Sequence, residues 1–127
     1  MIQIGLLGCG TVGSGVVKLL EKNASTIAQR SGDEIVIRRV MERDVEKCLA
    51  LGIDPQSITS NFQDIIDDPE IDIVVELMGG IEPAADYILQ AMRHGKHVVT
   101  ANKDLIAVKG KELFETAEEH QVDFYFE

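Results

Sequence analysis

Three glycines near the start of the chain have the spacing Gly8-x-Gly10-x-x-Gly13. An apolar run over residues 2–7 precedes them, and a helical pattern of apolar residues begins at Val12. Between a strand and a helix, Gly8 permits a sharp turn, Gly10 a close approach to a pyrophosphate, and Gly13 tight helix packing. The N-terminus of such a helix presents unpaired N–H groups to phosphates. The motif therefore predicts a dinucleotide site, and a purely structural turn is the alternative.

A charged cluster, Glu42-Arg43-Asp44, follows the next apolar run at residues 34–41. This is where a dinucleotide-binding unit places its ribose-reading residue, although the cluster lies further from the glycines than the usual ~20 residues. Glu42 or Asp44 could accept hydrogen bonds from a ribose diol, as in an NAD site. Arg43 could instead pair with a 2′-phosphate, as in an NADP site, with Lys47 one helical turn further on. The alternative for any of these residues is a solvated charged turn.

Two later loops carry further groups that could do chemistry. Met78-Gly79-Gly80 follows a β-branched run, and Thr100-Ala101-Asn102-Lys103 follows the next. Loops after the C-terminal ends of strands line the ligand crevice of an open α/β sheet. There Asn102 could hold a carboxamide or hydroxyl, and Lys103 could bind an anion or transfer a proton. The alternative for Lys103 is a solvent-facing residue at a helix start, which the helix dipole disfavours.

The elements that must position these loops alternate along the chain. Strand patterns occupy residues 2–7, 34–41, 71–78, 96–100 and 122–127. Helical patterns lie between them: after the glycines, at 45–52, at 62–66 behind Ser60-Asn61, from Glu82-Pro83 to 94, and from 103 to about 120. About five strands with no hairpin signals predict an α/β fold. The expected form is a Rossmann-like, doubly wound, mainly parallel sheet with helices on both faces.

Length and composition limit the class of protein. The 127 residues, 45% hydrophobic and 27% charged, suit one globular domain spanning residues 1–127. The net charge of −10 argues against nucleic acid as a partner. No run is long and apolar enough for a membrane span and no signal peptide is evident, so a cytoplasmic location is expected. Cys9 and Cys48 are expected to be buried, reduced thiols, and the histidines lack the spacing of metal ligands.

Three motifs together resemble one enzyme family. They are residues 5–16 (Gly-Leu-Leu-Gly-Cys-Gly-Thr-Val-Gly-Ser-Gly-Val), residues 75–80 (Val-Glu-Leu-Met-Gly-Gly) and residues 98–107 (Val-Val-Thr-Ala-Asn-Lys-Asp-Leu-Ile-Ala). The first is shared by many dehydrogenases, whereas the other two together are quite specific. Across essentially its whole length, the chain resembles the N-terminal, nucleotide-binding part of homoserine dehydrogenase. That family interconverts L-homoserine and L-aspartate 4-semialdehyde with NAD or NADP, a step towards threonine, methionine and isoleucine.

The resemblance implies a role for each matching residue. The residues implied to hold the pyrophosphate are Gly8, Gly10, Thr11, Val12 and Gly13. Arg43 would lie beside the adenosine ribose. The residues implied to surround the nicotinamide half are Met78, Gly79, Gly80, Thr100 and Asn102. Lys103 would stand at the junction of cofactor and substrate, as the candidate catalytic residue that transfers a proton to and from the substrate oxygen.

The chain departs from the family in length. Family members continue into a substrate-binding, dimerising domain, so this chain resembles an excised cofactor domain that binds nucleotide without turnover. A small amino-acid substrate and a homo-oligomer are then expected only of the longer enzyme. Rivals are an aspartate-semialdehyde dehydrogenase, which needs a catalytic cysteine, a sugar oxidoreductase, which would typically show Glu-Lys-Pro after the fourth strand, and a non-catalytic NAD(P)-sensing module.

Overall fold

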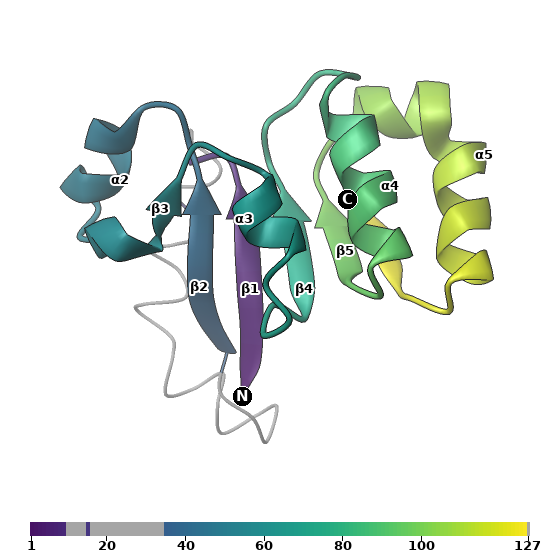
Figure 1. Cartoon of the computed structure of the whole chain (residues 1–127). Coiled ribbons are helices and arrows are strands. Elements are labelled where there is room, and N and C mark those ends of the chain that lie inside the picture. Colours follow the sequence, from purple (N-terminus) through teal and green to yellow (C-terminus); the bar gives the residue numbers. More distant parts are fainter. Residues whose placement is uncertain (10–14, 16–34, 127) are drawn as a thin grey trace.

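The computed structural model describes residues 1–9, 15 and 35–126, and within them it contains a six-stranded sheet. The strand order is β3-β2-β1-β4-β5-β6, and every neighbouring pair is parallel. The strands are β1 (Ile2–Leu7), β2 (Ile35–Met41), β3 (Ile58–Thr59), β4 (Ile73–Glu76), β5 (His97–Thr100) and β6 (Phe124–Phe126). The order reverses between β1 and β4, as in a Rossmann fold. All C-terminal strand ends therefore meet at one edge (Figure 1).

Apolar side chains alternate between the two faces of this sheet. Leu7 and Val74 belong to a core packed with residues of α3 (Gln63–Ile66), α4 (Ala84–Arg93) and α5 (Lys103–Glu119). Leu6 instead packs with Cys48 of α2 (Val45–Ala50) in a second cluster. Helices thus cover both faces, and Figure 1 shows α4 and α5 lying together at one end of the sheet. The predicted doubly wound fold is confirmed.

The strand predicted over residues 71–78 is shorter in the structure, where β4 ends at Glu76. The Leu77 amide still donates to the Leu7 carbonyl, at 2.9 Å. The next two amides, of Met78 and Gly79, donate to the Glu76 carboxylate rather than to a neighbouring strand. A side chain has replaced the sheet as the hydrogen-bond partner, and the chain turns away.

The last strand is also shorter than predicted, and one strand was missed. β6 begins at Phe124 because the Val122 amide closes the end of α5 on the Ala117 carbonyl and Gln121 has a positive φ of 56°. β3 has only two residues, too few for a periodic pattern to reveal. Of the second strand, Glu34 lies outside the described residues, as does the helix predicted after Gly13 apart from the helical Gly15.

The helices of the second half begin and end close to their predicted positions. α4 follows Glu82-Pro83, and α5 begins at Lys103 with Asn102 as its cap, the Asn102 Oδ1 accepting from the Leu105 amide at 3.1 Å. The Asn61 side chain likewise accepts from the Gln63 amide at the start of α3, at 3.0 Å. None of the described helices is both long enough and apolar enough to cross a membrane.

A cluster of charged residues around the buried Asp68 and Lys96 lies away from the C-terminal edge of the sheet and joins β2 to the start of β5. The Asp68 Oδ2 accepts from the Nε atoms of Arg38 (2.6 Å) and Arg39 (3.0 Å). The Lys96 ammonium donates to the carbonyls of Asp68 (2.7 Å) and Ile71 (3.0 Å). Burial alone would raise the pKa of Asp68, but hydrogen bonds from Arg38, the Glu70 amide and Arg39 hold it below its ordinary value. Burial lowers the pKa of Lys96.

We predict that Asp68→Asn lowers the free energy of unfolding by about 1–2 kcal/mol at pH 7, because it weakens the ion pairs with Arg38 and Arg39. The loss is modest because the paired arginines are partly solvated, with 36% and 33% of their side chains exposed. Since the folded-state pKa of Asp68 lies below 3.8, its contribution is present above that pH and disappears as the pH falls through the lower value. Urea unfolding at pH 7, 5 and 3 measures this. Asp67→Asn, which changes an exposed neighbouring carboxylate, is the control, and equal losses in both variants would contradict the prediction.

Candidate functional site

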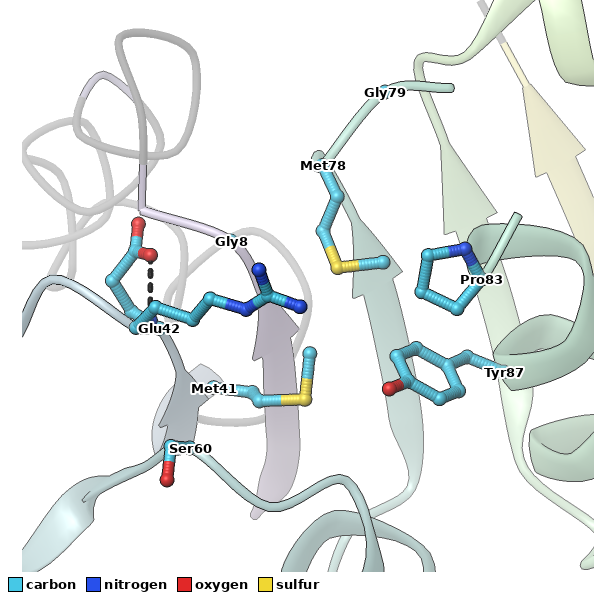
Figure 2. Close-up of a pocket in the computed structure, with 9 residues that line it drawn as sticks. Gly8, Met41, Glu42, Ser60, Met78, Gly79, Pro83 and Tyr87 are labelled. Carbon is cyan, nitrogen blue, oxygen red and sulfur yellow. Dashed lines mark hydrogen bonds between the residues drawn. The ribbon is translucent and has the colours of Figure 1, made fainter. Parts of the chain in front are cut away.

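A cavity of about 320 Å³ opens at the C-terminal edge of the sheet, between β1, β2 and β4. Its lining comes from loops that are distant in sequence: Gly8, Met41, Glu42, Arg43, Ser60, Met78, Gly79, Pro83 and Tyr87. In Figure 2 the Met41 and Met78 side chains lie between Glu42 on one side and the rings of Pro83 and Tyr87 on the other. The cavity therefore has a charged end and an apolar end, and it sits where the strand order reverses, the usual place for a ligand in this fold.

The Tyr87 ring is held rigidly at the apolar end. It stacks on the buried Phe62 ring with a centroid separation of 4.0 Å and an interplanar angle of 12°. Phe62 comes from the segment entering α3 and Tyr87 from α4, so the stack ties two segments of one sheet face together. The resulting wall is flat and apolar.

At the charged end, the Glu42 carboxylate joins two loops. Its Oε1 accepts from the Cys9 amide at 3.0 Å, and its Oε2 accepts from the Arg43 amide at 2.8 Å. The first bond reaches into the glycine motif and the second orders the charged cluster after β2. Glu42 thus positions backbone as well as lining the cavity, and among the lining residues that the structure describes Arg43 is the cationic one.

A second cavity of about 200 Å³ adjoins the first through the shared residues Met78 and Gly79. It lies between the ends of β4 and β5, and the rest of its lining is Glu76, Leu77, Ala101 and Asn102. The two cavities together follow the sheet edge across the point of strand reversal. An elongated ligand with two halves matches this arrangement.

Hydrogen bonds fix the loops around the second cavity. The buried Thr100 hydroxyl donates to the Glu76 Oε1 at 2.7 Å and accepts from the Asn102 amide at 3.1 Å. The Asn102 Nδ2 donates to the Gly80 carbonyl. The loops after β4 and β5 therefore form one connected unit, and Thr100 is buried beneath it rather than in the lining of either cavity.

Lys103 is the first residue of α5 and its side chain is exposed. It follows Asn102 directly, so its backbone is held by the Asn102 cap, while its side chain does not line either of the two cavities. An ammonium at the start of a helix is disfavoured by the dipole. A negatively charged ligand close by would offset that cost.

Glycines at the loop edge adopt backbone conformations that other residues rarely take. Gly8 has a φ of +96°, and a Cβ there would lie 3.2 Å from Met78 Cγ. Gly79 and Gly80 have φ values of +79° and +77°, with open space where a Cβ would point. The first glycine allows two loops to pack closely, while the other two leave the space above the loop free for a ligand.

Neither cysteine forms a disulfide and both are buried, as predicted. Burial raises the pKa of the Cys48 thiol to about 12, with a hydrogen bond to Cys9 adding to the effect. A thiol with this pKa stays protonated and is a poor nucleophile. This argues against Cys48 as the catalytic cysteine that one rival requires.

The structure describes eight of the twelve predicted site residues and places six of them at the two cavities or beneath their loops, whereas Gly80 and Lys103 line neither cavity. Gly8, Arg43, Met78 and Gly79 line the first cavity, Asn102 lines the second, and Thr100 lies beneath their loops. The predicted residues Gly10, Thr11, Val12 and Gly13 lie outside the described residues. Sequence reasoning missed Met41, Ser60, Glu76, Pro83 and Tyr87. A carboxylate inside a β-branched run was the available signal for Glu76, but nothing in the sequence pointed to Tyr87.

A family model described as "Homoserine dehydrogenase, NAD binding domain" matches residues 8–127. The chain belongs to this family. Homoserine dehydrogenases from Bacillus subtilis and Lactococcus lactis are 44% and 46% identical to it, each over 99% of the chain. The match covers 29% and 30% of their lengths. The chain thus spans less than a third of the length of those two relatives.

Solved structures agree with that assignment. A homoserine dehydrogenase from Thiobacillus denitrificans is 49% identical, with a TM-score of 0.92 over 99% of this chain and 29% of its own. One from S. aureus, at pH 7.0, is 46% identical with a TM-score of 0.90, over 99% of this chain and 32% of its own. The part of the chain that the structure describes therefore has the fold of these relatives.

We predict that Gly8→Ala lowers the free energy of unfolding by about 1 kcal/mol more than Gly52→Ala. Both glycines have positive φ values (+96° and +81°), so a side chain at either is strained, at about 1–2 kcal/mol. Only at Gly8 would the added Cβ also crowd Met78 and the Leu77 backbone, because nothing lies within 4 Å at Gly52. Urea unfolding of the two variants tests this, and equal losses would mean that the two loops do not pack as closely as described.

Proposed function

We propose that residues 1–127 form the NAD(P)-binding domain of a homoserine dehydrogenase, which interconverts L-homoserine and L-aspartate 4-semialdehyde. The observation that carries the proposal is the pair of adjoining cavities across the strand reversal, lined by residues of all three family motifs. Two cavities joined at Met78 and Gly79 suit a dinucleotide, with one half in each and the pyrophosphate near the glycine loop.

In this proposal the first cavity receives the adenosine half. Gly8 and the following glycines hold the pyrophosphate, and Arg43 lies beside the adenosine ribose. Because Glu42 already accepts from the Cys9 and Arg43 amides, its carboxylate is partly occupied, which favours Arg43 as the ribose-reading residue. A guanidinium at this position favours a 2′-phosphate and hence NADP over NAD.

The second cavity receives the nicotinamide half, against Gly79 and Asn102, with Gly80 held beside them by its hydrogen bond to Asn102. Open space above the two glycines supports this placement because a flat ring needs close approach to backbone. Thr100 contributes by holding Glu76 and Asn102 in place. The family's cofactor thus fits the groups that this chain presents.

The cofactor, when bound, supplies the exchange of hydride with the substrate's terminal carbon. The chain's own part is to orient the reactants and to move a proton. In the oxidative direction, a neutral Lys103 amine accepts the homoserine hydroxyl proton while the carbon loses hydride, which leaves an aldehyde and an ammonium. In the reverse direction the ammonium returns that proton to the oxygen. The substrate would be bound by regions that the relatives have beyond the matched part.

We also propose a cellular location and an oligomeric state for the longer enzyme. The resemblance to metabolic dehydrogenases supports a cytoplasmic location and a homo-oligomer. The net charge of −10 disfavours nucleic acid as a partner, because such partners require a basic face.

The first test is fluorescence titration of the chain with NADPH and NADH. We expect Arg43→Ala to weaken NADPH binding about tenfold and NADH binding less than twofold, because only NADPH carries the 2′-phosphate. NADPH binding should also weaken with added salt. Arg93→Ala, which removes an exposed guanidinium at the end of α4, is the charge-matched control. Absence of binding by either cofactor would refute the proposed domain. NADH binding that is as tight as NADPH binding or tighter, and that Arg43→Ala leaves unchanged, would move the ribose contact to Glu42 or Asp44.

The second test replaces the matching 126 residues of the Bacillus subtilis enzyme with this chain and assays aspartate 4-semialdehyde reduction. We expect activity in the chimera and a fall in kcat of about 10²-fold or more for Lys103→Met, with cofactor affinity changed little. Lys111→Met, an exposed lysine on the same helix, is the control. An inactive but folded, cofactor-binding chimera would instead favour a non-catalytic NAD(P)-sensing module.

A further inference from the structure

Glu76 is the last residue of β4 and is completely buried, with 0% of its surface exposed. Its Oε2 accepts from the Met78 amide at 2.7 Å and the Gly79 amide at 3.1 Å. Its Oε1 accepts from the Thr100 hydroxyl at 2.7 Å. The two amides can only donate, and the Thr100 hydroxyl, whose oxygen already accepts from the Asn102 amide, is placed to donate as well, so the carboxyl group accepts all three hydrogen bonds.

This negative charge has no cationic partner among the described residues. The ion pairs recorded there involve Asp68 and Asp123, at other places in the fold. Amide and hydroxyl dipoles solvate the Glu76 carboxylate but leave its net charge in place. Because the group is buried, water and salt screen that charge much less than they screen a surface charge.

The buried carboxyl group also lies beside a ligand-sized space. Glu76 lines the second cavity together with Gly79, Ala101 and Asn102. Under the proposed function, this cavity holds the nicotinamide half of the cofactor. The oxidised nicotinamide ring carries a positive charge and the reduced ring is neutral, so a fixed negative charge nearby acts differently on the two forms.

We propose that Glu76 discriminates between the redox states of the bound cofactor, its buried carboxylate favouring the cationic oxidised ring over the neutral reduced ring. The inference rests on the proposed function. It assigns Glu76 an electrostatic role in addition to its structural one, as a positioning residue for the loops after β4 and β5. A structural role alone would affect both forms of the cofactor alike, whereas the charge acts only on one.

The test is titration of the chain and its Glu76→Gln variant with NADP⁺ and with NADPH. Glutamine has nearly the same shape and keeps an acceptor oxygen for the loop, so the main loss is the charge. We expect the ratio of the Kd for NADP⁺ to the Kd for NADPH to rise on the order of tenfold, the scale of a partly screened charge pair. A tenfold rise corresponds to a shift of about 30 mV in the two-electron potential of the bound cofactor.

Two controls separate the charge from other effects. Asp86→Asn removes an exposed carboxylate on α4 and gives the same net charge, so the ratio should stay at the wild-type value. Thr100→Val loosens the same hydrogen-bonded unit without removing the Glu76 charge, so it should weaken the binding of both forms by similar factors. Circular dichroism reports whether each variant is folded.

A second variant keeps the inference testable if Glu76→Gln does not fold. Ala101→Lys places a cation at the exposed rim of the same cavity and leaves Glu76 unchanged. It should raise the same ratio about two- to fivefold, by opposing the cationic ring. An unchanged ratio in folded Glu76→Gln or, failing that, in Ala101→Lys would overturn the inference, whereas failure of the wild-type chain to bind either form would refute the proposed function.

Discussion

The pairing of β1 with a parallel strand on each side is the constraint on which the site depends. Ile4 of β1 pairs with Ile37 of β2 on one side and with Ile73 of β4 on the other. Because all three strands run in the same direction, the loops that follow them leave the sheet at the same edge. Strands β2 and β3 lie on one side of β1 and strands β4 to β6 on the other. The loops after β1 and β4 therefore diverge and leave a cavity between them. The cofactor site of the family follows from this topology.

Two carboxylates hold that edge together in similar ways. Glu42 follows β2 and accepts from the Cys9 amide after β1, while Glu76 ends β4 and accepts from the two amides after it. Each satisfies backbone donors that the sheet no longer pairs, which buried amides require. The loops after β1 and β4 are therefore held in place by hydrogen bonds to glutamate side chains rather than by continued strand pairing. A dinucleotide cofactor carries negative phosphates between its two halves and a redox-dependent charge on its nicotinamide ring, so the positions of these acids matter electrostatically.

Much of the fold could be predicted because the apolar periodicity is strong. The strands near residues 2–7 and 97–100 and the helices α4 and α5 lie where the pattern placed them. The ends of β4 and β6 could not be predicted, since they are set by the Glu76 side chain and by the closure of α5 on Val122. In the site, Gly8, Arg43, Met78, Gly79 and Asn102 could be found from motif spacing and position after a strand. Tyr87 and Ser60 could not, because they reach the cavity through the packing of other elements.

The sequence by itself determined most of the strands and helices, their order along the chain and the family, because these depend on local spacing and on motifs read along the chain. Tertiary structure alone decided which groups are buried and which partners they meet. Gly5 shows the difference: a Cβ there would come within 3.0 Å of Ile65, which is 60 positions further along the chain. Glu76 shows it as well, since a carboxylate in a strand could face solvent or be buried. Only the parallel pairing of β4 with β5 places Thr100 against Glu76 and buries the Glu76 carboxyl group beside the cavity.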